Sequence, residues 1–307
     1  MTDALLAAPP PPTLDASDVR LCLIDGSAFI FRAYFALPGV TRASDGLAVG
    51  AVLGFCNQLW DLMDRLRLGR NAPTHLAVVF DRPEKTFRHA LYPAYKAHRP
   101  PAPEDLIPQF DLVRQATAAF GVAGLELAGY EADDLIAAYA CHARDAGGKV
   151  TIVSQDKDLM QLVCERVSMF DTFRHGWIGH DHVVGKFGVA PNRVVDVQAL
   201  CGDAVDNVPG APGIGIKIAS ALINEYGDLD AVLARAGEVR QAGRRRSLID
   251  FADQIRLSRE LVRLDCAAPL PLPLADLAVT SPERAALGAF LEAMEFRSLA
   301  RRVDEWL

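Results

Sequence analysis

Residues 150–158, VTIVSQDKD, place an apolar run directly before two aspartates. Residues 21–25 (LCLID) and 75–81 (HLAVVFD) repeat the pattern, each ending in one aspartate. Near-continuous runs of valine, isoleucine and leucine are typical of strands buried on both faces of a parallel sheet. In open α/β sheets the functional site lies outside the carboxyl ends of such strands. The sequence therefore predicts an α/β fold with a parallel sheet and a cluster of acidic side chains at one edge.

Nine acidic residues follow a predicted strand or lie at a helix start or in an adjacent turn, which makes them candidates for this cluster: Asp25, Asp81, Glu131, Asp133, Asp134, Asp156, Asp158, Asp203 and Asp206. Gathered carboxylates repel one another, and a cluster of this size is tolerable around divalent cations. Oxygen-only donors favour Mg²⁺ or Mn²⁺ over zinc. Two such ions about 4 Å apart can promote the cleavage of a phosphate ester.

Helix capping offers an alternative explanation for each acidic motif taken alone. The segment YEADDLIA begins a predicted helix, where acidic residues are common. Within it, Glu131 and Asp134 share a helix face, whereas Asp133 points about 100° away. The combination of all these motifs in one α/β chain favours metal binding over capping.

Composition indicates an ordinary globular protein, with 50% apolar and 23% charged residues among 307. Neither a secretory signal nor a membrane span is predicted, and six cysteines without a CxxC pair favour reduced thiols in the cytoplasm. The net charge is −7, but assigning nine of the 39 acidic residues to the cluster leaves 30 against 32 basic residues. A nucleic-acid partner is therefore compatible with the charge.

Three parts are expected along the chain: a disordered proline-rich tail (1–18), an α/β core (19–180) and a helical region (181–307). In the core, we predict helices at about 47–68, 105–120 and 131–146.

Two further segments are candidates for contacts with nucleic acid. The glycine-rich residues 210–215, GAPGIG, resemble the hairpin of helix–hairpin–helix elements, whose amides approach a phosphate at a helix start. The stretch from 82 to 103 alternates basic residues with aromatic ones that can stack on bases. A structural loop is the alternative for each. The residues assigned to DNA binding are Arg82, Lys85, Tyr92, Arg99, Gly210, Gly213, Gly215 and Lys217.

Five ordered motifs are similar to the 5′-nuclease (flap endonuclease) superfamily, nearest to the 5′→3′ exonuclease domain of bacterial DNA polymerase I: LIDGSAFIFRAYFAL, VVFDRPEKTFRHALYPAYKAHRP, YEADDLIA, IVSQDKDLMQLV and CGDAVDNVPGAPGIGIKIA. The similarity spans about residues 20 to 302. It implies a PIN-like core, a helical arch at about 82–103 and a duplex-binding helix–three-turn–helix at about 198–225. It also implies cleavage of 5′ flaps and 5′ ends with two Mg²⁺ ions, in primer removal and repair.

The resemblance assigns roles to individual residues. Asp25, Asp81, Glu131, Asp133 and Asp134 match one metal group, and the other four acids match the second. Lys96 and Arg88 match basic arch residues near the scissile phosphate. A K⁺ ion held by the helix–three-turn–helix loop, up to Ser220, is a further expectation.

No polymerase region follows Leu307, so we expect a free-standing monomer or an excised domain that works with a polymerase. All nine acids are present, which argues for catalytic competence. A non-catalytic DNA-structure binder and a PIN-type ribonuclease remain the alternatives.

Overall fold

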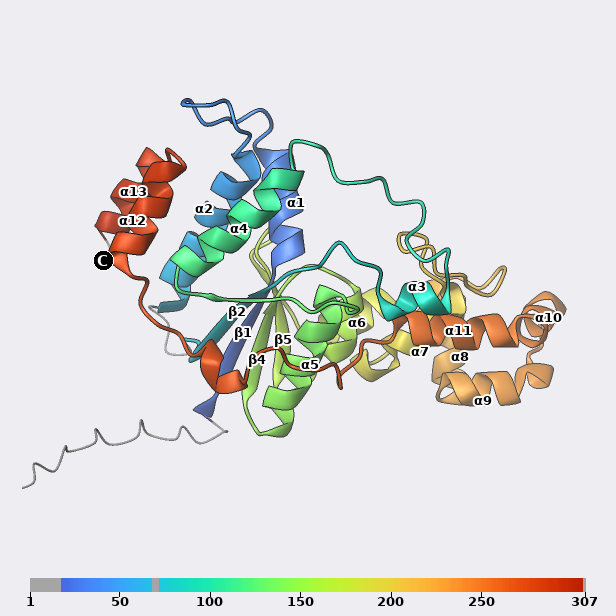
Figure 1. Ribbon diagram of the computed structural model, residues 1–307. Coiled ribbons are helices and arrows are strands. Elements are labelled where there is room, and N and C mark those ends of the chain that lie inside the picture. Colours follow the sequence, from blue (N-terminus) through green and yellow to red (C-terminus); the bar gives the residue numbers. More distant parts are fainter. Residues whose placement is uncertain (1–17, 68–71, 306–307) are drawn as a thin grey trace, which may run out of the picture.

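The structure is a computed structural model that describes residues 18–67 and 72–305 (Figure 1). The predicted proline-rich tail, apart from Asp18, lies outside the described residues. One six-stranded sheet forms the centre, in the order β3-β2-β1-β4-β5-β6. Five strands are parallel and β6 is antiparallel to β5. The strands are β1 (Arg20–Asp25), β2 (His75–Val79), β3 (Ala123–Leu125), β4 (Lys149–Val153), β5 (Val167–Asp171) and β6 (Gly176–Ile178).

The three strands predicted from apolar runs, β1, β2 and β4, lie side by side at the middle of the sheet. Their register pairs Ile24 with both Val78 and Val153. Because these strands end level with one another, the residues that follow each apolar run meet at the same edge of the sheet. The strands β3, β5 and β6 were not predicted from the sequence.

Helices cover both faces of the central strands because successive side chains point to opposite faces. Cys22 and Ile24 pack against α1 (Gly26–Ala36), α2 (Gly50–Arg67) and α4 (Ile107–Ala119). Leu21 and Leu23 pack instead against α5 (Ala132–Asp145). The predicted helices correspond to α2, α4 and α5, whereas α1 was not predicted.

The helical region continues the α5 side of the core. Its helices are α6 (His180–Phe187), α7 (Val194–Cys201), α8 (Ile216–Tyr226), α9 (Leu229–Ala234), α10 (Ala242–Asp250) and α11 (Ala252–Val262), with 3₁₀ turns η3 (Pro191–Arg193) and η4 (Ala236–Glu238). One hydrophobic cluster runs without a break from Ile152 of β4 through Leu200 of α7 to Ile255 of α11. The sheet and the helical region therefore share a core.

The C-terminal segment differs from the expected division at residue 180. The chain returns to the sheet through η5 (Leu274–Leu277), and Ala278 forms a bridge with His75. Helices α12 (Arg284–Ala293) and α13 (Arg297–Asp304) then lie beside α2 and α4 (Figure 1). They bury Leu287 and Leu299 in the same cluster as Ile24. Their apolar faces make this segment part of the α/β core and not of the helical region.

The expected helical arch is largely irregular backbone. Only α3 (Phe87–Leu91) is helical, and residues 92–106 form turns and extended backbone on the way to α4 (Figure 1). Proline residues interrupt this stretch and remove the amide donors that a continuous helix requires.

Two cysteines also depart from expectation. Cys141 of α5 and Cys266 are joined as a disulfide, with Cα atoms 5.9 Å apart, because the segment after α11 runs along α5. The other four cysteines are free thiols. Within the described ranges, no helix combines the length and apolar character needed to cross a membrane.

Candidate active site

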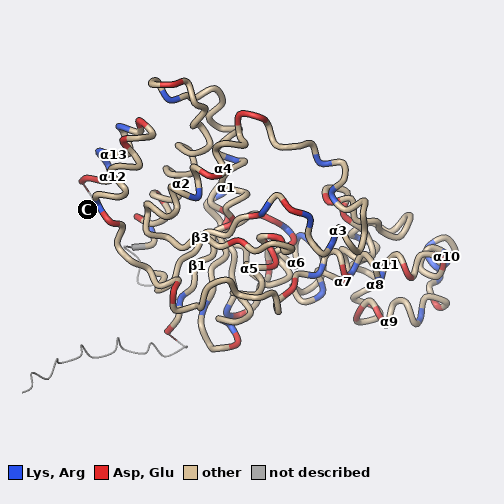
Figure 2. Tube along the Cα trace, viewed as in Figure 1, with Lys and Arg blue, Asp and Glu red and all other residues tan. Residues whose placement is uncertain are grey.

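Acidic positions gather along the backbone at the carboxyl edge of the central strands, beside the start of α5 (Figure 2). Burial raises the pKa of Asp25 to about 6, and repulsion from Asp81 and Asp156 adds to this rise, although two hydrogen bonds oppose it. The pKa of Asp133 lies well above its usual range because of burial and then repulsion from the same three carboxylates. Asp25, Asp81, Asp133 and Asp156 are therefore electrostatic neighbours in one group.

A second part of the cluster extends toward the helical region. Asp158 begins the 3₁₀ turn η2 (Asp158–Leu162), and its pKa is raised to about 7 by burial and by repulsion from Asp156 and Asp203. Asp203 lies at the start of the loop between α7 and α8, where its carboxylate is 2.5 Å from Lys157 Nζ. Asp156 thus faces both groups of acids.

Hydroxyl and amide donors orient the strand-end carboxylates. Asp25 accepts hydrogen bonds from Ala28 N at 2.9 Å and from the Ser154 hydroxyl at 2.8 Å. Asp81 accepts from the Ser27 hydroxyl at 2.6 Å and from Ala132 N at 2.9 Å. Sequence analysis missed both serines, although Ser154 directly follows the apolar run of β4 and so met the criterion used for the aspartates.

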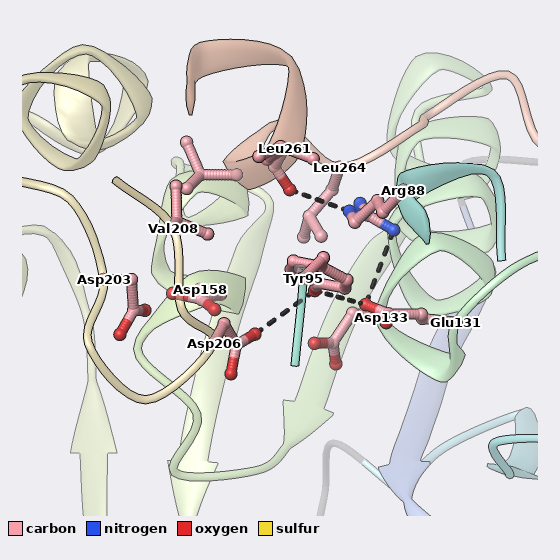
Figure 3. A pocket seen from close by; sticks show the side chains of 11 residues that line it. Arg88, Tyr95, Glu131, Asp133, Asp158, Asp203, Asp206, Val208, Leu261 and Leu264 are labelled. Atoms are coloured by element: carbon pink, nitrogen blue, oxygen red, sulfur yellow. Dashed lines mark hydrogen bonds and ion pairs between the residues drawn. The ribbon is translucent and has the colours of Figure 1, made fainter. Parts of the chain in front are cut away.

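Glu131 and Asp206 lie on either side of Tyr95 in a separate corner of the site (Figure 3), where Lys96 and Arg99 balance their charges. The Tyr95 hydroxyl lies 3.0 Å from Glu131 Oε2 and 3.2 Å from Asp206 Oδ2. Lys96 Nζ is 2.8 Å from Glu131 Oε1, and Arg99 also pairs with Asp206. Burial opposes ionisation of Asp206, but Lys96 and Arg99 hold its pKa below the usual range.

The backbone of the loop holds these cations in place. Lys96 has a left-handed φ of 53°, and its amide donates to the carbonyl of Asp206 at 2.9 Å. Lys96, Arg99 and Lys157 all lie among the acids, so side-chain cations already offset part of the repulsion for which the sequence suggested divalent ions.

A cation fits the chemistry of this site, although no coordination shell is preformed. Within residues 18–67 and 72–305, no three Asp, Glu, His or Cys side chains come close enough to hold one ion. The carboxylates accept hydrogen bonds from hydroxyl, amide and ammonium groups. These partners and the mutual repulsion of the carboxylates keep the carboxylates apart. Three of them, Asp25, Asp133 and Asp158, have raised pKa values, and their oxygens are the donors that hard divalent cations prefer.

Arg88 and Asp134 were predicted at the scissile phosphate and at a metal, but they pair with each other. Arg88 lines the same pocket as Glu131 and Asp133 (Figure 3), and its Nη1 lies 3.5 Å from Glu131 Oε2. Arg88 is 1% exposed, and its Nη1 and Nη2 lie 2.6 and 2.7 Å from the two oxygens of Asp134. Arg88 also donates to the carbonyls of Leu261 and Arg263, at 2.8 and 3.0 Å. In this structure the ion pair joins α3 to the start of α5 and the end of α11.

Helix capping explains this placement of Asp134. Glu131 is the N-cap of α5, and Asp134 accepts a hydrogen bond from Glu131 N at 3.1 Å. The Asp134 carboxylate therefore turns back over the helix start, toward Arg88. Asp133 points to the sheet edge instead. The helix face that Glu131 and Asp134 were expected to share is therefore not the face that meets Asp25, Asp81 and Asp156.

The remaining predicted contacts of the arch differ in exposure. Arg82 is paired with Glu84 and Glu126, whereas Lys85 is exposed. Tyr92 and Tyr95 pack onto α11, in a cluster with Leu261. These rings face the protein, so the arrangement does not offer them to unpaired bases.

The glycine-rich turn between α7 and α8 contains glycines with different structural requirements. A Cβ on Gly210 would lie 2.3 Å from the carbonyl carbon of Cys201, so this glycine serves contact within the protein. Gly213 has a left-handed φ of 75°, which favours glycine. Gly215 has an ordinary φ of −92° and open space around its Cβ position. With Lys217, it lies exposed at the start of α8.

The carbonyl groups of this turn accept hydrogen bonds from side chains of α10 and α11. Ser258 donates to the carbonyl of Pro209, Gln254 to that of Gly210 at 2.9 Å, and Ser247 to that of Pro212 at 2.8 Å. The expected K⁺ residue Ser220 is also turned inward, where its hydroxyl donates to Lys217 O. This arrangement suits an anion at the exposed amides better than a cation at the carbonyls.

Known proteins resemble this chain over most of its length. A family model described as "5'-3' exonuclease, N-terminal resolvase-like domain" matches residues 20–188, and "5'-3' exonuclease, C-terminal SAM fold" matches residues 189–285. DNA polymerase I of Rhizobium leguminosarum is 53% identical over 93% of this chain and 28% of its own length. The 5'-3' exonuclease of Aquifex aeolicus (strain VF5) is 37% identical over 93% of this chain and 95% of its own length.

Solved structures support the fold. A flap endonuclease of bacteriophage T5, in a complex with DNA and metal ions, matches with a TM-score of 0.66 and 19% identity. The match covers 90% of this chain and 99% of that one. The predicted class, a parallel-sheet core with a helical C-terminal module, is confirmed.

We expect Asp158→Asn to stabilise the protein at neutral pH when divalent ions are removed with EDTA. The folded pKa of about 7 lies above the ordinary value of 3.8, so stability falls as pH rises through this window and the loss is complete above it. The gain in free energy of unfolding from the substitution should therefore grow by about 2 kcal/mol between pH 5 and pH 8. Urea denaturation measures it, with Asp250→Asn on exposed α10 as the control. An equal gain at both pH values would contradict the burial and repulsion described for Asp158.

We expect the effects of Arg88→Gln and Asp134→Asn on stability to be strongly non-additive. Arg88→Gln leaves the buried Asp134 charge without a cation, and Asp134→Asn leaves Arg88 only the more distant Glu131, at 3.5 Å. Breaking a buried ion pair in this way costs about 3–5 kcal/mol, whereas the double variant removes both charges. The coupling energy from urea denaturation in EDTA should exceed about 2 kcal/mol. If Asp134 faced an open metal site, its substitution would be additive with that of Arg88 and would not lower metal-free stability.

Proposed function

This chain belongs to the 5′-3′ exonuclease family, as its motifs predicted, and on that premise we propose that it is a structure-specific 5′-nuclease. It hydrolyses phosphodiester bonds of DNA at 5′ flaps and at 5′ ends. The observation that carries this proposal is the group of mutually repelling carboxylates at the sheet edge, with Lys96 and Arg99 on one side. Such a group is suited to hold cations against a phosphate.

We propose two Mg²⁺ or Mn²⁺ ions as the cofactors. Asp25, Asp81 and Asp133 would hold one ion and Asp158 and Asp203 the other, because repulsion raises pKa values within each group. Asp156 faces both groups and so is the candidate to bridge them. When bound, such ions activate water and stabilise the leaving oxygen. The serine and amide donors to Asp25 and Asp81 would keep these carboxylates oriented.

Lys96 and Arg99 are the proposed phosphate-binding residues. Both contact carboxylates at the border of the cluster, and Arg99 is half exposed. Cations bound at the neighbouring carboxylates would weaken the ion pairs of Lys96 and Arg99 with Glu131 and Asp206. These two side chains would then pair with the phosphate and stabilise its developing charge. Arg88, with its guanidinium bound to Asp134 and two carbonyls, is not a candidate for this role.

The turn before α8 is the proposed contact with duplex DNA. Gly213, Gly215 and Lys217 are exposed, and hydrogen bonds within the helix start with the amides of Ile218 and Ala219. The amides of the first turn and the helix dipole are therefore directed toward an approaching phosphate. Asp203 precedes this turn in the same loop, which couples duplex binding to the carboxylate cluster.

In the cell, we propose that the protein is a monomer in the cytoplasm. It would act on nicked and branched duplexes and on RNA-primed 5′ ends, beside a DNA polymerase. The identity with DNA polymerase I of Rhizobium leguminosarum supports this setting, although the chain spans 28% of that protein.

The decisive experiment uses a 5′-labelled double-flap DNA with Mg²⁺. The wild-type protein should release the flap, and Asp133→Asn should reduce the single-turnover rate by at least about 100-fold while affinity for the flap changes less than tenfold. A single-stranded RNA of the flap sequence serves as the comparison. Absence of cleavage by the wild-type protein would favour a DNA-structure binder, and faster cleavage of the RNA would favour a ribonuclease.

Gly210 and Gly215 of this turn form a matched pair for substitution. We expect Gly210→Ala to lower the melting temperature, since its Cβ would meet Cys201, and Gly215→Ala to leave it unchanged. Gly215→Ala should weaken binding to a nicked duplex severalfold, measured by fluorescence anisotropy, with little change for a single strand. Normal duplex affinity in this folded variant would show that the turn is only structural.

A further inference from the structure

We infer a second nucleic-acid surface, which binds an unpaired strand on the open face of β4, β5 and β6. Along β4 and β5, Val150 and Met169 are buried in the core shared with α5. Their neighbours Thr151, Ser168 and Phe170 point to the opposite face and are only partly buried. Helices α1 and α2 cover that face over β1 and β2, as the burial of Cys22 and Val78 shows, but leave the β4–β6 half accessible.

Two neighbouring cavities form a groove along this face. One, of about 320 Å³, is lined by Arg20, Lys149, Arg166 and Trp177. The other, of about 140 Å³, is lined by Arg32, Phe170 and Thr172. Arg65 of α2 lines both cavities, so they are adjacent at this residue.

The groove is strongly basic at the amino ends of the strands, away from the carboxylate cluster. Arg20 and Lys149 are partners in the register of β1 and β4, and Arg166 precedes β5. In the described part of the chain, none of these three side chains is paired with a carboxylate. Arg20 donates to the carbonyls of Ala72 and Asp18, and Arg166 to that of Gly147, which leaves their charges uncompensated.

Few acidic groups oppose this charge. Glu165 lines the first cavity and Asp61 the second. Asp61 is already paired with Arg302 of α13 at 2.6 Å. The groove is therefore suited to a polyanion.

Aromatic rings accompany the cations. Trp177 is 64% exposed and packs against Phe170, with ring centroids 5.1 Å apart, so one side of the indole is supported and the other accessible. Phe173 is equally exposed, and the guanidinium of Arg32 lies 5.0 Å from its ring centre. Exposed rings on a sheet bordered by cations are the arrangement that binds single strands, through stacking and phosphate contacts.

The same geometry selects an unpaired strand over a duplex. The bases of a duplex are stacked on one another and do not offer their faces to a ring on a protein surface. Phosphate contacts alone would use the cations but leave Trp177 without a role. An acidic peptide would satisfy the cations, and it is the competing occupant.

Trp177 provides a direct test, because stacking on a base quenches indole fluorescence. A twelve-residue oligothymidine would be titrated into the full chain in EDTA, so that the measurement is independent of cleavage and of the proposed metals. We expect saturable quenching that is lost in Trp177→Phe. The charge reversal Lys149→Glu with Arg166→Glu should weaken the binding reported by Trp177 at least tenfold.

A matched control is available at two arginines that do not line either cavity of the groove. Arg284→Glu with Arg297→Glu makes the same change of charge on α12 and α13, and it should alter the binding less than twofold. Melting temperatures establish that each variant is folded. Four outcomes would each overturn the inference. They are no quenching, equal losses in the two charge-reversed variants, equal binding of a blunt duplex at Trp177, and binding of polyglutamate in place of the oligonucleotide.

Discussion

Mutual repulsion among the carboxylates at the edge of the sheet is the constraint on which the rest of the molecule depends. Asp25, Asp81, Asp133 and Asp156 are brought together by strands that end level, and burial makes their charges costly. The fold responds with a donor for nearly every carboxylate: hydroxyls at the strand ends, amides at the start of α5, and cations at the border with the loop. A divalent cation bound there would offset the carboxylate charges with its own full charge, which hydroxyl and amide dipoles do only in part.

Much of this arrangement was predictable because it follows from local patterns. The apolar runs of β1, β2 and β4 located the central strands, and the rule that parallel strands share a carboxyl edge located the acids. The predictions failed where a side chain's environment comes from distant segments. Arg88 is drawn inward by carbonyls at positions 261 and 263, and Tyr92 and Tyr95 by α11. Nothing in the residues near position 88 indicates those partners.

Patterns of half-buried residues were also missed. The strands β5 and β6 alternate between the core and an open face, so the segment VSMFDTFRHGWI lacks the continuous apolar run that identified the other strands. Helix α1 was overlooked because it begins directly after Asp25, whose carboxylate caps it. Similarly, the shared face of Glu131 and Asp134 was inferred from helix periodicity, whereas capping of Glu131 decides the direction of the Asp134 side chain. Local capping thus overrode the simple expectation of shared faces.

The unbroken hydrophobic cluster from β4 to α11 has a consequence for how the molecule unfolds. The boundary between the two matched family regions, near residue 188, crosses this cluster, and the hydrogen bonds from Arg88 to the carbonyls of Leu261 and Arg263 cross the same boundary. The two regions therefore lack separate interiors and melt as one cooperative unit, with core amides on both sides exchanging hydrogen through the same global opening. Loss of packing in the helical region would therefore separate the carboxylates at the same moment.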